Sequence, residues 1–209
     1  CIRDSLEVEL KKRGHNLPVY FGNRNWHPFA SETAEKMSQD GVRKVAVFAT
    51  SAWGGYSACR QYDEDIQRMR EHLAEQGLPD IEFTKIRQFF DHPKFVAEMA
   101  AAVTEVWGQV PEEKKESTRL LFTAHSVPVA HDNVGGAEGD KNLYSRQVAE
   151  ASRLVAARAG ISDYDLVWQS RSGNPRTPWL EPDIVDKTTD IHHNEGIDTV
   201  VVCPIGFIS

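Results

Sequence analysis

The chain has 209 residues, of which 24 are Lys or Arg and 31 are Asp or Glu, giving a formal net charge of -7. With 40% hydrophobic and 9% aromatic residues, it has the composition of a globular protein with one large core or two modest ones, which excludes a fibrous or wholly disordered chain. The acidic balance argues against nucleic acid as a partner, because neutralising phosphates requires a concentrated basic surface. No apolar run approaches the ~18 residues of a membrane span, so we expect no transmembrane segment. The segment Cys1–Arg13 is a charged amphipathic run instead of a signal peptide, so we expect a cytoplasmic protein.

Predicted strands and helices alternate along the chain. Short runs rich in Val, Ile, Phe and Tyr predict strands at residues 18–22, 44–50, 81–89, 119–124, 165–170 and 199–205. Apolar residues spaced by three or four positions predict helices at residues 31–39, 57–76, 93–107, 144–159 and 181–193, with glycines as C-terminal stops at Gly77, Gly160 and Gly196. This alternation is typical of parallel strands joined by right-handed crossovers, so we expect an α/β doubly wound architecture.

The pattern is interrupted between residues 87 and 93. We interpret this segment as a crossing between two half-sheets and predict one domain over residues 1–91 and a second over residues 92–209. The chain opens on a predicted helix and stops on a predicted strand, so we interpret it as an excerpt from a longer protein. The spacings of the dinucleotide-binding and P-loop fingerprints do not occur in the sequence.

Residues suited to ligand binding follow the predicted strands. In an open parallel sheet the ligand crevice lies beyond the carboxyl ends of the strands, so functional residues should concentrate there. Aromatic, polar and basic side chains are frequent in four such segments, at residues 21–28, 51–57, 125–128 and 171–179. They include Trp26, Trp53 and Trp179. A crevice lined in this way suits a large, flat, conjugated ligand with acidic substituents.

His125 is the strongest single candidate for a functional residue, because it directly follows a predicted apolar strand and is followed by a tight Ser-Val-Pro turn. A neutral imidazole there can accept a proton or bind a metal, whereas a core histidine bonded to backbone is the structural alternative. Cys59, near a predicted helix start, is a possible metal ligand, although an isolated cysteine is more often inert. We interpret Cys203 as a small hydrophobic residue in a buried strand. His192, His193 and Glu195 lie at the end of a predicted helix, and we interpret them as solvent-exposed surface.

Four segments match one enzyme family in order and spacing. They are LLFTAHSVP at residues 120–128, NLYSRQV at 142–148, VWQSRSGNPRTPWLEP at 167–182 and VVVCPIGFIS at 200–209. Together they resemble the ferrochelatases. Two upstream segments, LPVYFGNRNWHPF at residues 17–29 and VFATSAWGGYSACRQYDEDI at 47–66, resemble the actinobacterial type, the coproporphyrin III ferrochelatases.

The resemblance implies two Rossmann-like domains with parallel sheets flanked by helices and a porphyrin cleft between them. It implies insertion of Fe²⁺ into a free-base porphyrin, coproporphyrin III, to give coprohaem in haem biosynthesis. His125 then faces the macrocycle as the catalytic residue, serving as Fe²⁺ ligand or proton acceptor. We expect the porphyrin to be bound by Tyr56, Ser51 and Arg24.

The family pattern also extends past the matched segments. It continues with Asp-His-x-Glu, whose Glu works with the HSxP histidine, and it begins with a further strand and loop, so we expect this excerpt alone to be inactive. Many actinobacterial members carry a [2Fe-2S] cluster held by one internal cysteine and three in a C-terminal tail. Cys59 stands at the internal position, so we expect the cluster only in the full-length protein. Trp179 and Arg171 are expected to be structural or rim residues.

Other functions stay open at this stage. A cobalt or nickel chelatase would keep the fold and the histidine, although QSRSG and WLEP look specific to the iron family. A non-catalytic tetrapyrrole-binding module would keep the aromatic residues and lack the metal pair.

Overall fold

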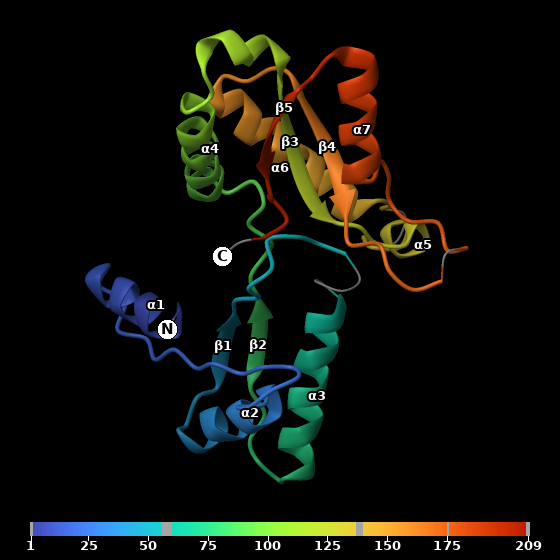
Figure 1. Cartoon of the computed structure of the whole chain (residues 1–209). Helices are drawn as coiled ribbons and strands as arrows, with labels where there is room; N and C mark the ends of the chain where they lie inside the picture. The colour runs from blue at the N-terminus through green and yellow to red at the C-terminus, as the bar shows by residue number, and fades with distance from the viewer. Residues whose placement is uncertain (1, 56–59, 137–139, 175, 208–209) are drawn as a thin grey trace. The chain divides into compact units, whose positions relative to one another are not determined.

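The computed structural model describes residues 2–55, 60–136, 140–174 and 176–207. It contains helices and two parallel β-sheets (Figure 1). The chain divides into two compact units, one formed by residues 1–49 and 61–86 and the other by residues 50–60 and 87–209. The architecture is therefore α/β with parallel sheets, as the alternating pattern predicts. The predicted domain division at residues 91 and 92 stays a prediction.

The first unit is a small two-stranded sheet with helices on one face. Its elements are α1 (Ile2–Lys12), α2 (Ala30–Gln39), β1 (Lys44–Val47), α3 (Gln61–Glu75) and β2 (Glu82–Lys85). β1 and β2 are parallel, with Lys44 opposite Glu82. The core joins α2 and α3 to the sheet, because Met37 of α2 and Leu73 of α3 belong to one buried cluster against which Val45 and Phe83 pack.

One strand prediction in this unit is wrong. Residues 18–22 form no strand, and the nearest pairing is an isolated bridge between Asn23 and Phe29. The sheet of this unit consists of β1 and β2 alone, so the run at 18–22 has no ladder partner. A strand needs a neighbour to satisfy its backbone groups, and the apolar pattern by itself cannot supply one.

The second unit is a three-stranded parallel sheet in the order β4-β3-β5, covered on both faces. Its elements are α4 (Pro93–Gly108), η2 (Glu112–Ser117), β3 (Thr118–His125), α5 (Val129–Asp132), α6 (Leu143–Ala159), β4 (Tyr164–Gln169), α7 (Ile184–Glu195) and β5 (Thr199–Cys203). One face of the sheet shares a core with α4 and α6, which includes Phe122 and Val155. Leu121 on the other face packs with Ile191 of α7. β3 is thus buried on both sides, as its unbroken apolar run predicts.

Local signals explain where these helices begin and end. Asp183 caps α7 by accepting a hydrogen bond from the backbone N–H of Val185 at 2.8 Å. Gly160 and Gly196 end α6 and α7 with φ of 73° and 72°, the left-handed conformation that glycine adopts without strain. Both glycines are therefore the C-terminal stops that the sequence predicts. Within the described ranges, no helix has both the length and the apolar character needed to cross a bilayer.

The segment after β1 belongs to the second unit and supplies part of its core. Trp53 is 5% exposed there and packs edge-on against Phe95, with ring centroids 6.1 Å apart. Its indole Nε1 donates to the carbonyl of Gly206 at 3.2 Å. Trp53 therefore fills the core of this unit instead of lining an open crevice, because Gly54 beside it packs against Leu143 of α6 and its indole bonds to the segment after β5.

Candidate functional site

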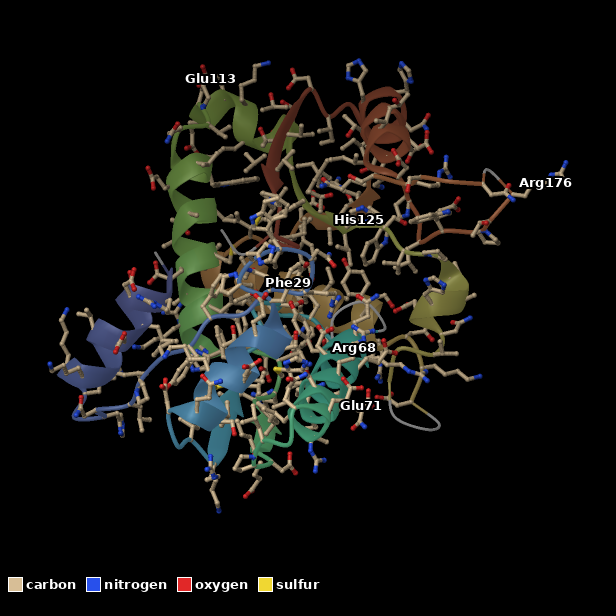
Figure 2. The ribbon with its side chains drawn as sticks, turned by 90° about the horizontal axis from the view of Figure 1, so that it is seen from below. Phe29, Arg68, Glu71, Glu113, His125 and Arg176 are labelled. Atoms are coloured by element: carbon tan, nitrogen blue, oxygen red, sulfur yellow. The ribbon has the colours of Figure 1, made fainter. Side chains whose placement is uncertain are left out.

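The carboxyl ends of β3 and β4 lie side by side in the second unit. His125 is the last residue of β3 and pairs in register with Gln169, the last residue of β4. The sequence-based placement of His125 at the edge of a buried strand is therefore confirmed. The residues before it on β3 are buried, whereas the His125 side chain is exposed; Figure 2 labels it.

One hydrogen bond fixes the tautomer of the neutral His125 ring. Nδ1 lies 2.5 Å from the backbone carbonyl oxygen of Ser126. A carbonyl oxygen can only accept, so this geometry assigns the proton of the neutral ring to Nδ1. Nε2 then carries the free lone pair. A ring held in this tautomer can accept a proton, or bind a metal ion, through Nε2.

The backbone around His125 is held by partners that sequence reasoning missed. The N–H of Ser126 donates to the carbonyl of Gln169 at 2.7 Å, and the hydroxyl of Tyr144 donates to the carbonyl of His125 at 2.9 Å. The Ser126 side chain is buried and donates to the carbonyl of Leu180 at 2.9 Å. Tyr144 and Gln169 both lie in segments that carry the family resemblance, but their spacing from His125 gives no sign of the contact.

The segment that follows β4 returns to the strand exit of β3. Leu180 donates its N–H to the carbonyl of Val127 at 3.0 Å, and an antiparallel bridge joins Pro128 to Trp179. The indole Nε1 of Trp179 is buried without a hydrogen-bond partner. Trp179 thus lies beside the residues that follow β3, whereas Arg176 lies on the exposed outer part of the same loop (Figure 2).

Ser170, directly after Gln169, has a φ of 64°. This left-handed conformation is uncommon for residues other than glycine and costs on the order of 1 kcal/mol. Such strain persists only where the surroundings hold the backbone. It therefore marks the end of β4, beside His125, as a constrained position.

A buried carboxylate, that of Asp132, holds the start of α6. Asp132 is 1% exposed and accepts hydrogen bonds from the N–H of Ser145 at 3.1 Å and from its hydroxyl at 2.6 Å. The side chain of Asn142 also donates to Asp132, at 3.2 Å. These bonds fix the first turn of α6, which carries Tyr144.

The remaining predicted substrate-binding residues are distributed over both units. Ser51 belongs to the second unit, where its hydroxyl accepts a bond from the N–H of Trp53 at 3.3 Å. Arg24 belongs to the first unit, where it pairs with Asp65 at 2.7 Å and lies over the ring of Tyr62 at 5.1 Å. A substrate carboxylate would compete with Asp65 for this guanidinium. Tyr56 and Cys59 lie outside the described residues.

The cysteines of this chain cannot hold a [2Fe-2S] cluster by themselves. Such a cluster takes four protein ligands, usually four thiolates, whereas this chain contains three cysteines. Cys203 is buried in β5, and burial raises the pKa of its thiol to about 11, so it stays protonated near neutral pH. Across the part of the chain that the structure describes, no group of three or more His, Cys, Asp or Glu side chains could hold a metal ion. The expectation of a cluster finds no support.

The described residues thus form an α/β protein with parallel sheets, in which an exposed histidine lies at the end of a central strand. Comparison with known proteins shows which family this is. The model of the ferrochelatase family matches residues 2–209, so the chain belongs to the ferrochelatase family.

The curated relatives that the chain matches include three proteins named coproporphyrin III ferrochelatase. The protein from Corynebacterium glutamicum is 57% identical over 205 residues, which cover 98% of this chain and 55% of the relative. The protein from Corynebacterium diphtheriae is 58% identical over 215 residues, which cover 100% of this chain and 58% of the relative. The protein from Nocardia farcinica is 54% identical over 205 residues, covering 98% and 57%. The chain thus spans about half the length of the curated relatives it matches.

Proposed function

We propose that the complete protein inserts Fe²⁺ into a free-base porphyrin, and that this porphyrin is coproporphyrin III, giving coprohaem in haem biosynthesis. The observation that carries the proposal is the exposed imidazole of His125 at the end of the central strand, with Nδ1 bonded to Ser126, in a member of the ferrochelatase family. The names of the relatives support coproporphyrin III as the substrate and iron, instead of cobalt or nickel, as the metal.

The reaction exchanges two pyrrole protons for one Fe²⁺ ion, so a base beside the ring lowers its barrier. Nε2 of His125 accepts a pyrrole proton as the nitrogen lone pair turns toward the metal. Because the imidazole is exposed, it can pass that proton to solvent and accept the second. Each time the ring is neutral, the Nδ1 bond to Ser126 favours the tautomer whose Nε2 can accept the next proton.

Two parts of the proposal rest on the family resemblance. The first is a porphyrin cleft between two Rossmann-like domains, with the division near residues 91 and 92. The second is contact between the porphyrin and Tyr56, Ser51 and Arg24. For Arg24 the resemblance requires that a porphyrin propionate either displace the Asp65 carboxylate from the guanidinium or share the guanidinium with it.

Replacing His125 tests the proposed function. In the complete protein we expect His125→Ala to abolish iron insertion while porphyrin affinity stays within about tenfold, which corresponds to ~1.4 kcal/mol. The measurements are an anaerobic insertion assay and a porphyrin fluorescence titration.

His192→Ala is the matched control, because the Nδ1 of His192 also faces a backbone carbonyl, that of Ile197 at 3.0 Å, but at the end of α7. This variant should insert iron at the wild-type rate. Equal insertion rates for His125→Ala and the wild type would overturn the role of His125.

A further inference from the structure

The carbonyl of His125 lies where the β3 ladder loses one of its neighbours. Pairing between β3 and β5 ends with Phe122 opposite Cys203, and Gly206 then donates its N–H to the carbonyl of Thr123 at 3.1 Å. Carbonyls along a strand alternate in direction, so the His125 carbonyl faces the same side as that of Thr123. In the described part of the chain, the donor that meets it is the hydroxyl of Tyr144, at 2.9 Å.

The peptide that joins His125 to Ser126 is held from both edges. Its carbonyl accepts from Tyr144, and its N–H donates to the carbonyl of Gln169 at 2.7 Å. These two groups lie in one plane, so fixing both of them fixes the rotation of that plane. The next carbonyl, that of Ser126, is the acceptor for the imidazole Nδ1. That carbonyl belongs to the following peptide, so the clamped peptide fixes the backbone from which the acceptor extends.

Tyr144 is itself rigidly placed. Its ring packs against Trp168 of β4 with centroids 5.7 Å apart, and its first turn of α6 is anchored by the buried Asp132. The backbone of Gly55 approaches so closely that an added Cβ would lie 3.3 Å from the Cβ of Tyr144. Burial raises the pKa of the Tyr144 phenol, so the hydroxyl keeps its proton and remains a donor.

We propose that Tyr144 is a positioning residue for His125, and that its hydroxyl clamps the 125–126 peptide so that the imidazole keeps Nδ1 on Ser126 and its Nε2 lone pair aimed outward. The inference rests on the proposed function, because the clamp matters to catalysis only if His125 acts through Nε2. The clamp itself is a property of the fold and can be measured without any turnover.

Tyr144→Phe in the complete protein removes the hydroxyl and leaves the ring on Trp168. We expect kcat for iron insertion to fall about tenfold, equivalent to ~1.4 kcal/mol of activation free energy, with KM for coproporphyrin III within twofold. Tyr164→Phe is the matched control, because Tyr164 begins β4 at the opposite end of the sheet and packs edge-on against Phe122. This control should keep the wild-type kcat.

Long-range ¹⁵N–¹H correlation spectra of the histidine rings supply the readout that a merely structural role would not move. The His125 signal, assigned by its absence in His125→Ala, should show the Nδ1–H tautomer in the wild type and a mixture of tautomers in Tyr144→Phe. An unchanged His125 signal or an unchanged kcat in Tyr144→Phe would overturn the proposal, and so would an equal loss of kcat in Tyr164→Phe. If His125→Ala keeps wild-type activity, the proposed function fails, whereas the spectra still decide whether Tyr144 holds the ring.

Discussion

Arg119 joins three elements of the second unit through carboxylates. Its guanidinium lies 3.1 Å from Asp163, 2.8 Å from Asp165 of β4 and 2.7 Å from Glu195 of α7. The Arg119 side chain is only 11% exposed, so its charge depends on these partners. It lies near the start of β3, at the opposite end of the strand from His125. The role that follows is structural.

Arg119→Ala should lower the free energy of unfolding by about 2–3 kcal/mol, because it leaves carboxylates without their main partner. The loss is smaller than for a fully buried pair, because Asp163 and Glu195 are 69% and 39% exposed and Lys187 still lies 3.3 Å from Asp165. Urea denaturation followed by circular dichroism measures the effect. Arg153→Ala is the control, because Arg153 pairs with Glu150 on the exposed surface of α6 and its loss should cost ~0.5 kcal/mol or less. Equal losses in the two variants would contradict the account of Arg119.

At the residue scale, the position of His125 could be predicted and its partners could not. A histidine directly after an apolar run is visible in the sequence, because strand ends face the ligand edge of a parallel sheet. The contact with Tyr144 depends on how α6 packs across Trp168, which no local pattern encodes. Likewise, the aromatic character of Trp53 suggested a crevice wall, whereas only the packed structure shows that it is buried.

Gly206 sets how closely the segment after β5 can approach β3. A Cβ added at Gly206 would lie 2.8 Å from the Cα of Ala124, the residue before His125. That contact is with backbone, so the two segments would have to separate. Gly206 also accepts the indole bond of Trp53. The glycine therefore allows three chain segments to meet beside the candidate site.

Gly206→Ala should destabilise the protein by about 2 kcal/mol, in the range for overpacking a fixed contact. Gly108→Ala is the matched control, because Gly108 ends α4 with no atom within 4 Å of an added Cβ, and we expect its stability to be unchanged or slightly increased. Thermal and urea unfolding of the two variants supply the comparison. A wild-type midpoint for Gly206→Ala would show that the close approach is not needed.

At the scale of elements, the central strand was predicted best. The run at residues 119–124 became β3, Thr118–His125, because burial on both faces gives an unbroken apolar pattern. The helix predicted from Glu181 begins instead at Ile184, since Pro182 accepts a bond from the N–H of Trp168 and Asp183 serves as the cap. The run at 18–22 shows the opposite limit. Its composition favours a strand, but strand formation depends on a partner elsewhere in the fold.

The whole molecule consists of two compact units, and their boundaries do not follow one cut in the sequence. Residues 50–60 interrupt the first unit and belong to the second, where Trp53 enters the core. Alternation of strands and helices predicts the α/β class, because periodicity reports local structure. Periodicity cannot show that residues 50–60 belong to the second unit, because that assignment depends on the tertiary packing of a few side chains.

The Soret band of the complete protein, followed under anaerobic conditions with free-base coproporphyrin III and Fe²⁺, decides whether it is a chelatase. A parallel reaction with protoporphyrin IX compares the substrates. We predict enzyme-dependent conversion to the iron complex, faster for coproporphyrin III than for protoporphyrin IX, and lost in His125→Ala. A shifted Soret band without conversion would contradict the proposed function and would indicate a tetrapyrrole-binding module.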